Sequence, residues 1–104
     1  MIVARWTVEA RFGHKAIAID LMKRWLAEIG PQLGWTKDNT VMLTGSVGAN
    51  ESTIVSEVRL NNLGELHQAF EALARIESHQ HWALDLEPYV VSGTPRWEVF
   101  RVVE

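Results

Sequence analysis

The sequence opens with an alternation of apolar and polar side chains from Ile2 to Phe12. Trp6 and Val8 belong to the apolar phase, whereas Arg5 and Glu9 belong to the polar phase. Successive side chains of an extended chain point to opposite sides, so this period of two predicts a β-strand with one apolar face.

The spacing then changes to that of an amphipathic helix, which we predict from His14 to Ile29. Asp20 and Arg24 lie four residues apart, the spacing of an ion pair on a helix surface. Gly30 and Pro31 end this helix, because glycine accepts a left-handed cap and proline cannot continue the hydrogen-bond ladder. The predicted apolar stripe comprises Ile17, Leu21 or Met22, Trp25 and Ile29.

Two further strands are predicted from Thr40 to Val47 and from Thr53 to Leu60. The segment Gly48-Ala49-Asn50-Glu51-Ser52 has the residues of a turn, so these two strands should form a hairpin. A second alternation of apolar and polar residues, from Pro95 to Val103, predicts the last strand of the chain.

A second helix should begin after Asn62, because Asn62 followed by Glu65 resembles a capping box. Glu71 and Arg75 have the spacing of an ion pair on its surface. The apolar spacing is lost at 77–79, which predicts a kink or a break in the helix. Ser78 is a candidate cap for a second, short helical segment that ends before Pro88. This segment carries Trp82, Ala83 and Leu86. The predicted stripe of the helix comprises Leu66, Phe70, Leu73 and Ile76.

The resulting order is βαββαβ. Its simplest packing is an α+β ferredoxin-like sandwich, a four-stranded antiparallel sheet with two helices on one face, since right-handed crossovers place both helices there. With 104 residues, the chain should form a single domain over 1–104. The other face of the sheet must be polar or dock on a second copy, and five tryptophans in so short a chain also favour an oligomer.

Composition narrows the classes of partner. The net charge is −3 and the basic residues are dispersed, so no nucleic acid is expected. The chain has no cysteine, which excludes disulfides, thiolate nucleophiles and cysteine-ligated metals and fits the cytoplasm best. No stretch has the length and apolarity of a signal peptide or a membrane helix, so no membrane association is expected either.

Several motifs are missing. The segment Gly45-Ser46-Val47-Gly48 is not a nucleophile elbow, since its serine directly follows the glycine and lies in a hairpin. No phosphate-binding, dinucleotide-binding, zinc-protease or EF-hand pattern occurs, so no cofactor is predicted. His79 and His81 would diverge by about 200° on a helix, and Glu77 and Asp85 are placed to pair with His81, so no metal site is predicted.

Several segments together resemble the dimeric α/β-barrel superfamily and, within it, NIPSNAP-like proteins. They are Arg11-Phe12-Gly13-His14-Lys15, Gly45-Ser46-Val47-Gly48-Ala49-Asn50, Leu60-Asn61-Asn62-Leu63, and His79-Gln80-His81-Trp82 running to Leu86-Glu87-Pro88. The resemblance implies a homodimer in which the open sheet faces of two protomers form a barrel whose lumen can hold a small molecule. It supports the fold more directly than any activity.

Relatives in that superfamily include cofactor-independent monooxygenases of antibiotic biosynthesis and heme-degrading monooxygenases. The heme-degrading relatives use an asparagine on the first strand together with a tryptophan and a histidine. This chain has Thr7 and no asparagine on its first strand, although Trp82, His79 and His81 are available. The resemblance therefore does not favour heme degradation.

Charged residues of the first and third strands should face one another, because these strands are neighbours in a ferredoxin-like sheet. We expect either a ladder of cross-strand ion pairs or, in the barrel, anchors for an anionic ligand group. The positions of the charges place Trp6 and its phase under the helices, whereas the family pattern would place that phase in the lumen. The residues predicted to line the lumen are Arg5, Thr7, Glu57, Arg59, His79 and Trp82.

The five tryptophans are predicted to fall into two groups. Trp6, Trp25 and Trp97 are expected in the core, whereas Trp35 and Trp82 are expected to be freer. Trp82, where the second helix breaks, is a candidate for the lid or wall of a cavity or for a dimer contact. Three functions remain open: a homodimeric barrel that binds a small, partly apolar molecule, a cofactor-independent monooxygenase-like enzyme acting on an aromatic or polyketide-like substrate, and a protein-interaction module. Whether the chain is an enzyme is not decided by its sequence.

Overall fold

The structure is a computed structural model that describes residues 1–104. Its strands are β1 (Ile2–Glu9), β2 (Thr40–Thr44), β3 (Thr53–Leu60) and β4 (Arg96–Arg101). Its α-helices are α1 (Lys15–Glu28), α2 (Leu63–Leu73) and α3 (Glu77–Leu86), and two short 3-10 helices, η1 (Gly30–Leu33) and η2 (Glu87–Tyr89), follow α1 and α3.

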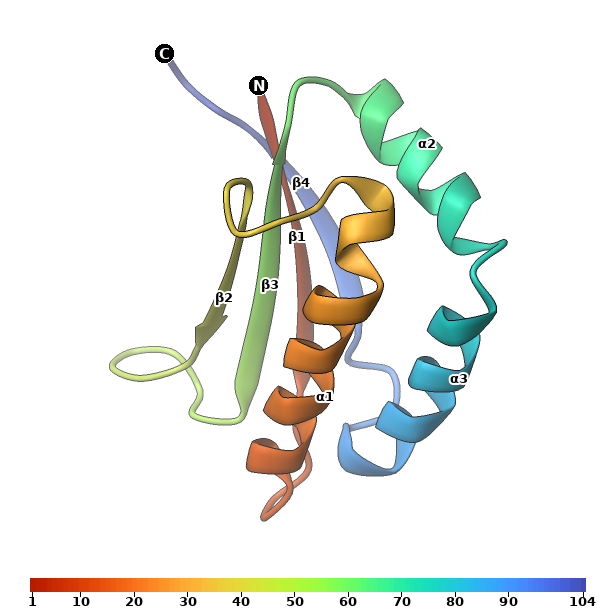
Figure 1. The fold of residues 1–104 in the computed structure, drawn as a ribbon. Helices are drawn as coiled ribbons and strands as arrows, with labels where there is room; N and C mark the ends of the chain where they lie inside the picture. Colours follow the sequence, from red (N-terminus) through yellow and green to blue (C-terminus); the bar gives the residue numbers. More distant parts are fainter.

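The strands form one antiparallel sheet in the order β2-β3-β1-β4, and the helices lie on one face of it (Figure 1). This is the α+β ferredoxin-like fold that the element order predicted. The face away from the helices carries no covering layer within the chain (Figure 1). No helix is long and apolar enough to cross a membrane.

The register of the sheet shows which residues share a face. Trp6 lies opposite Ser56 on β3 and Trp97 on β4, so these three side chains are on the same face. Ala4 and Val8, in the same phase as Trp6, are completely buried under the helices. The orientation that followed from the charges is therefore confirmed.

The predicted break in the second helical segment is confirmed, since α2 ends at Leu73 and α3 begins at Glu77. The predicted cap is wrong, because Ile76 occupies the N-cap position and Ser78 is inside α3. Ile76 has an extended backbone conformation, which turns the chain between the two helices. As a result α3 lies beside α1, and α2 covers the other end of the sheet (Figure 1).

Two predicted ion pairs on helix surfaces are wrong. Arg24 binds Asp85 of α3 at 2.8 Å and not Asp20, because the break brings α3 against α1. Glu71 is paired with His67 at 3.1 Å and not with Arg75. Periodicity within one helix could not show a partner that a neighbouring helix supplies.

The start of α2 confirms the cap at Asn62. Its side-chain oxygen accepts a hydrogen bond from the Glu65 amide at 3.0 Å. The Glu65 carboxylate accepts in turn from the Asn61 amide at 2.9 Å, one residue before the position that a capping box uses. This hydrogen bond lowers the pKa of Glu65.

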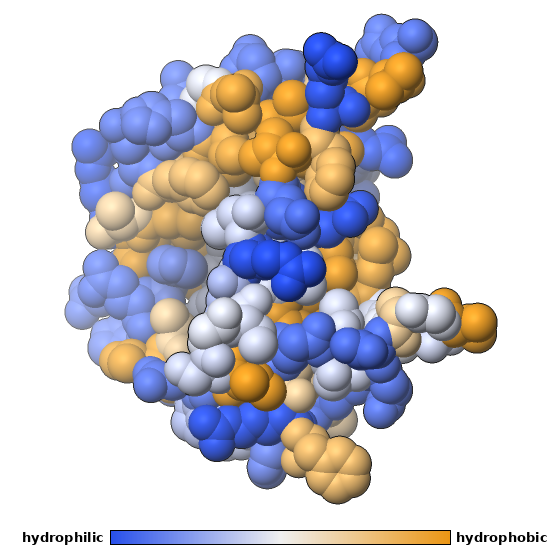
Figure 2. All heavy atoms as spheres, turned by 180° about the vertical axis from the view of Figure 1, so that it is seen from behind, coloured by the Kyte–Doolittle hydropathy of each residue, from blue (hydrophilic) through white to orange (hydrophobic).

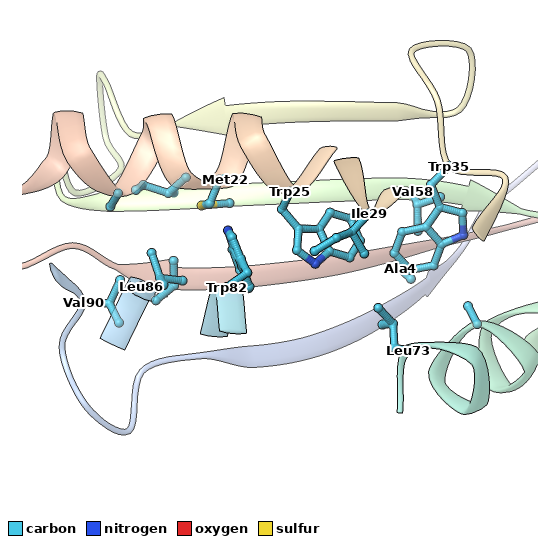
Figure 3. Packing of buried hydrophobic residues seen from close by; sticks show 14 of the residues in the cluster. Ala4, Met22, Trp25, Ile29, Trp35, Val58, Leu73, Trp82, Leu86 and Val90 are labelled. Atoms are coloured by element: carbon cyan, nitrogen blue, oxygen red, sulfur yellow. The ribbon is translucent and has the colours of Figure 1, made fainter. Parts of the chain in front are cut away.

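The buried stripe of α1 runs through Ala18, Met22 and Trp25 and continues to Ile29. The sequence predicted Ile17 in place of Ala18, but Ile17 is exposed. Only the first member of the stripe differs, which leaves the small side chain of Ala18 in the buried position. The core that results is continuous and contains three of the five tryptophans, Trp25, Trp35 and Trp82 (Figure 3).

Candidate functional site

A cavity of about 470 Å³ lies between the helices and the sheet. All five tryptophans of the chain contribute to its lining, and the other lining residues include Phe70, Leu73, His79 and Ser56. No Asp, Glu, Lys or Arg side chain lines it. The cavity is therefore an uncharged, aromatic space of the size that small-molecule sites have.

Different elements place the tryptophans around this space. Trp25 comes from α1 and Trp82 from α3, whereas Trp6 and Trp97 are cross-strand neighbours on β1 and β4. The ring of Trp25 lies 6.1 Å from that of Trp82 and 5.8 Å from that of Trp35, centroid to centroid. Figure 3 shows Trp82, Trp25 and Trp35 following one another along the core.

Trp35 reaches the cavity because the chain turns back after α1. Its amide donates a hydrogen bond to the Gly30 carbonyl at 2.9 Å, which closes the turn around η1. A Cβ at Gly30 would lie 2.9 Å from the Trp35 carbonyl oxygen, so this close approach requires glycine. The prediction that Trp35 is free is wrong, since its side chain is only 4% exposed.

Part of the cavity lining is exposed at β4. Trp97, which the sequence placed in the core, is 40% exposed there and makes an edge-to-face contact with Phe70 of α2, with centroids 5.2 Å apart. β4 is an edge strand, and the corner between α2 and α3 leaves this part of the sheet only partly covered. We infer that Phe70 and Trp97 form the mouth of the cavity.

Two indole N–H groups are fixed by hydrogen bonds. Trp25 Nε1 donates to His79 Nδ1 at 2.9 Å, and Trp82 Nε1 donates to the Leu21 carbonyl at 2.6 Å. Each bond connects α1 with α3, so the two helices are held together by the same rings that form the cavity wall. The side chains therefore present preorganised aromatic surfaces.

His79 is the only ionisable residue that lines the cavity. Desolvation by burial lowers its pKa, so the imidazole is neutral near pH 7. Its ring is stacked on Trp82 with an interplanar angle of 20°. The cavity thus offers a neutral imidazole and aromatic surfaces, and no carboxylate that could act as a general acid or base.

The six residues predicted to line a lumen lie on two different sides of the sheet. His79 and Trp82 line the cavity under the helices. Arg5, Thr7, Glu57 and Arg59 belong to the opposite, open face, as the strand register shows. Because the sheet separates the two groups, they do not form one site.

On the open face, Arg5 and Glu57 are directly opposite each other, and Arg5 Nε lies 2.5 Å from a Glu57 carboxylate oxygen. The Arg5 guanidinium also lies 4.6 Å from the centre of the Phe100 ring. Thr7, between β3 and β4, is buried by its neighbours although no helix covers it. Arg5 is therefore held by an ion pair and a cation–π contact.

The predicted ladder of ion pairs is reduced to this one pair. The Glu9 carboxylate accepts hydrogen bonds from the hydroxyls of Ser52 and Thr53 at 2.7 and 2.6 Å. Arg59 lies opposite Val3 and makes no ion pair, and Arg11 donates to the Val90 carbonyl at 3.0 Å. Which charged side chains meet depends on the register of β1 against β3, and this register could not be predicted from the sequence.

The histidines outside the cavity have ordinary surroundings. His81 lies 3.6 Å from Glu77 on the same helix, as predicted, while Asp85 is bound to Arg24. His14 packs on Tyr89, with ring centroids 5.5 Å apart. No group of three His, Asp or Glu side chains is placed to hold a metal ion.

No protein-family model and no curated protein matches this sequence. Solved structures match its fold. A NIPSNAP family protein from Agrobacterium tumefaciens aligns with a TM-score of 0.81 and 16% identity, over 99% of this chain and 93% of that one. A NIPSNAP domain protein from Burkholderia xenovorans aligns with a TM-score of 0.71 and 14% identity, over 99% and 95%.

SnoaB from Streptomyces nogalater, described as a cofactor-independent oxygenase, aligns with a TM-score of 0.69 and 13% identity, over 99% of this chain and 93% of that one. The predicted NIPSNAP-like, ferredoxin-like fold is confirmed by these neighbours. At such identities the likeness establishes the fold, and the activity must be argued from the site.

Proposed function

We propose that this chain binds a small, planar, uncharged molecule in the tryptophan-lined cavity. One observation carries the proposal: a cavity of about 470 Å³ is surrounded by all five tryptophans and contains no charged side chain. Ligand sites in proteins are concave, mostly apolar and supplied with few polar groups, and this cavity has each property.

The lining also favours a flat ligand. The rings of Trp35 and Trp82 are tilted by 51° and 55° to that of Trp25, so the lining combines indole faces and indole edges. Aromatic rings prefer offset-stacked or edge-to-face partners at centroid separations of about 4.5 to 7 Å. A planar ligand would find such partners, whereas an ionic group would lose its hydration with no opposite charge to compensate.

Tryptophan fluorescence titrated with naphthalene tests the proposal. Binding should change the emission in a saturable way, because the ligand would contact several indole rings at once. Ala83→Phe adds a ring at a cavity-lining position of α3 and should weaken binding strongly. Ala16→Phe makes the same change on the exposed side of α1 and should leave binding unchanged. A non-saturable response, or equal weakening by both variants, would contradict the proposal.

A cofactor-independent oxygenase is a second candidate, favoured by the fold shared with SnoaB. The cavity offers His79 as its only ionisable group, and that ring already accepts a hydrogen bond from Trp25. An oxygenase should consume dioxygen when it is mixed with an oxidisable phenolic substrate, and His79→Phe should abolish the uptake. Saturable binding without oxygen uptake would leave the chain as a binding protein.

We also propose that the open sheet face docks on a second copy of the chain. Val41, Leu43 and Phe100 lie on this face and are each more than 40% exposed. In Figure 2, which views the molecule from behind, hydrophobic patches alternate with strongly hydrophilic side chains. Paired polar groups between apolar ones are compatible with burial in a dimer.

Light scattering tests this second proposal. The expected mass is about twice the 11.8 kDa of one chain. Leu43→Arg should shift the protein to a monomer without unfolding it, because the side chain is exposed within the protomer. A wild-type protein that is folded and monomeric at micromolar concentration would reject the dimer and favour the alternative of an interaction surface for another protein.

A further inference from the structure

We propose that His79 donates a hydrogen bond to the ligand through Nε2, so that the cavity selects planar molecules that carry a hydrogen-bond acceptor. This inference rests on the proposed function, since it names the class of ligand for the same cavity. Its starting point is the bond from Trp25 Nε1 to His79 Nδ1, at 2.9 Å.

That bond fixes the tautomer of His79. An indole N–H can only donate, so Nδ1 must act as the acceptor. In a neutral imidazole the other nitrogen then carries the hydrogen, which makes Nε2 a donor. Burial lowers the pKa of His79 and so favours the neutral form that this arrangement needs.

The orientation of the ring is fixed as well. Trp82 stacks on His79 with ring centroids 5.8 Å apart, and Trp25 meets it edge-on at 6.2 Å. The imidazole is therefore held by two neighbours, and its Nε2 has no hydrogen-bond partner within the protein. A donor that is held in place and unpartnered at a cavity wall is complementary to an acceptor on a ligand.

The rest of the lining points to the same ligand class. The indole N–H groups of Trp6, Trp35 and Trp97 also make no hydrogen bond within the protein, so further donors occur among the lining residues, beside the oxygens of Ser56 and Gln80. A carbonyl oxygen or a ring nitrogen would satisfy such a donor without bringing a charge into the cavity. The fixed tautomer also argues against Nε2 as a general base, since it has no free lone pair.

Naphthalene and quinoline form a matched pair of probes. They have nearly the same shape, but quinoline has one ring nitrogen that accepts a hydrogen bond and is uncharged at about pH 7.5. Dissociation constants for both are measured by tryptophan fluorescence in the wild type and in His79→Phe, which keeps a ring but removes the donor. The ratio of the two constants should change by about threefold to tenfold in favour of naphthalene in the variant.

Two further variants sharpen the test. Trp25→Phe removes the N–H that fixes the tautomer, so it should reduce the preference for quinoline while His79 is still present. His67→Phe makes the same substitution as His79→Phe on the exposed surface of α2, outside the cavity, and should leave the preference unchanged. Nitrogen-15 NMR of the wild type gives an independent readout and should show His79 with its hydrogen on Nε2.

The outcomes separate the two proposals. If naphthalene binds but the ratio is the same in wild type and His79→Phe, the donor role is wrong and the cavity remains a binding site. A wild-type spectrum with the hydrogen on Nδ1 would also reject the donor role, even where the variants fail to fold. If neither probe binds, the proposed function itself fails and the inference with it.

Discussion

The two faces of the sheet are built from alternate residues of the same strands, yet they differ in chemistry. Under the helices, Trp6 and Trp97 face a cavity without charged side chains. On the open face, Arg5 is held between Glu57 and Phe100. One face thus borders an uncharged cavity, whereas the other carries charged side chains, of which Arg5 and Glu57 are paired across the sheet.

The difference shows which face is suited to which kind of partner. The apolar cavity on the helix side is already formed, because its rings are fixed by hydrogen bonds such as that of Trp82 to Leu21, and we propose that it takes a small ligand. The open face exposes Val41, Leu43 and Phe100 around its ion pair and is suited to a broad, flat surface. The predictions below test this division.

The largest expected effect compares one substitution on both faces. Val8 is fully buried under the helices, and Val55 is half-buried on the open face. Val8→Ala should lower the free energy of unfolding by about 2.5 kcal/mol, because it leaves a cavity in a packed core. Val55→Ala should cost less than about 1 kcal/mol.

Urea unfolding monitored by circular dichroism measures both changes. Repeating the measurement at several protein concentrations sharpens the comparison, since the cost of Val55→Ala depends on concentration only if the open face is buried in a dimer. If both variants lost the same unfolding free energy at high dilution, the proposed difference between the two faces would be wrong.

The second effect is confined to the helix side and compares two tryptophans of the cavity. Trp82→Phe removes the hydrogen bond to the Leu21 carbonyl and part of a buried ring, so it should cost about 2 kcal/mol of unfolding free energy. Trp97→Phe should cost less than about 1 kcal/mol, because Trp97 is partly exposed and its N–H is unpartnered. Thermal unfolding of both variants decides whether the inner wall of the cavity is more important for stability than its mouth.

The third effect concerns the ion pair of the open face. A double-mutant cycle with Arg5→Met and Glu57→Gln should give a coupling free energy of about 0.5 kcal/mol in the isolated protomer, because Arg5 is partly exposed and solvent screens the pair. The coupling should decrease as salt is added. Strict additivity of the two substitutions would show that the pair contributes nothing to stability.

The smallest effect is a pH dependence from the cavity side. The pKa of His79 is lower in the folded protein than in the unfolded chain, because burial penalises the charged imidazole. The unfolded state therefore binds more protons, and stability should fall as the pH is lowered through about 6.5 and below. His79→Gln should remove this part of the pH dependence of chemical unfolding.

The effect of Glu65 on stability can be separated from that of His79 in the same experiment, because the two occur at different pH. Its pKa is lowered from 4.5 by the hydrogen bonds from Asn61, so its contribution to stability is present above that value and is lost at more acidic pH. The slope due to His79 should therefore appear first as acid is added, and it should persist in Glu65→Gln. A curve that is flat from pH 7 to about 5 in the wild type would contradict the assignment to His79.

The strands and their faces could be predicted from the sequence because alternation is a local property. The charges at Arg5 and Glu57 indicated the polar face, and the ferredoxin-like element order made β1 and β3 neighbours; the structure confirms both. The break before α3 was also visible, since the apolar spacing fails at 77–79. Each of these signals depends on residues close together in the chain or on one pair of neighbouring strands.

The cavity could not be predicted in the same way. Trp35 reaches it through a turn closed on Gly30, and Arg24 finds its partner on another helix, so neither contact has a spacing in the sequence that announces it. The six lumen candidates were divided by the sheet for the same reason. An excess of tryptophan was the one signal available, and it indicated an interface or a pocket without showing which side of the sheet would hold it.

The corner between α2 and α3 keeps the helical layer from being one long straight rod. One uninterrupted helix from Leu63 to Leu86 would be about 36 Å long at the usual rise per residue, and the longest extent of the whole molecule is 37 Å. Such a rod would be straight, whereas the two shorter helices meet at an angle and form a concave layer (Figure 1). A substitution that makes the chain helical through Ile76 would therefore change the curvature of this layer, and the volume enclosed beneath it would change without any alteration of the tryptophans themselves.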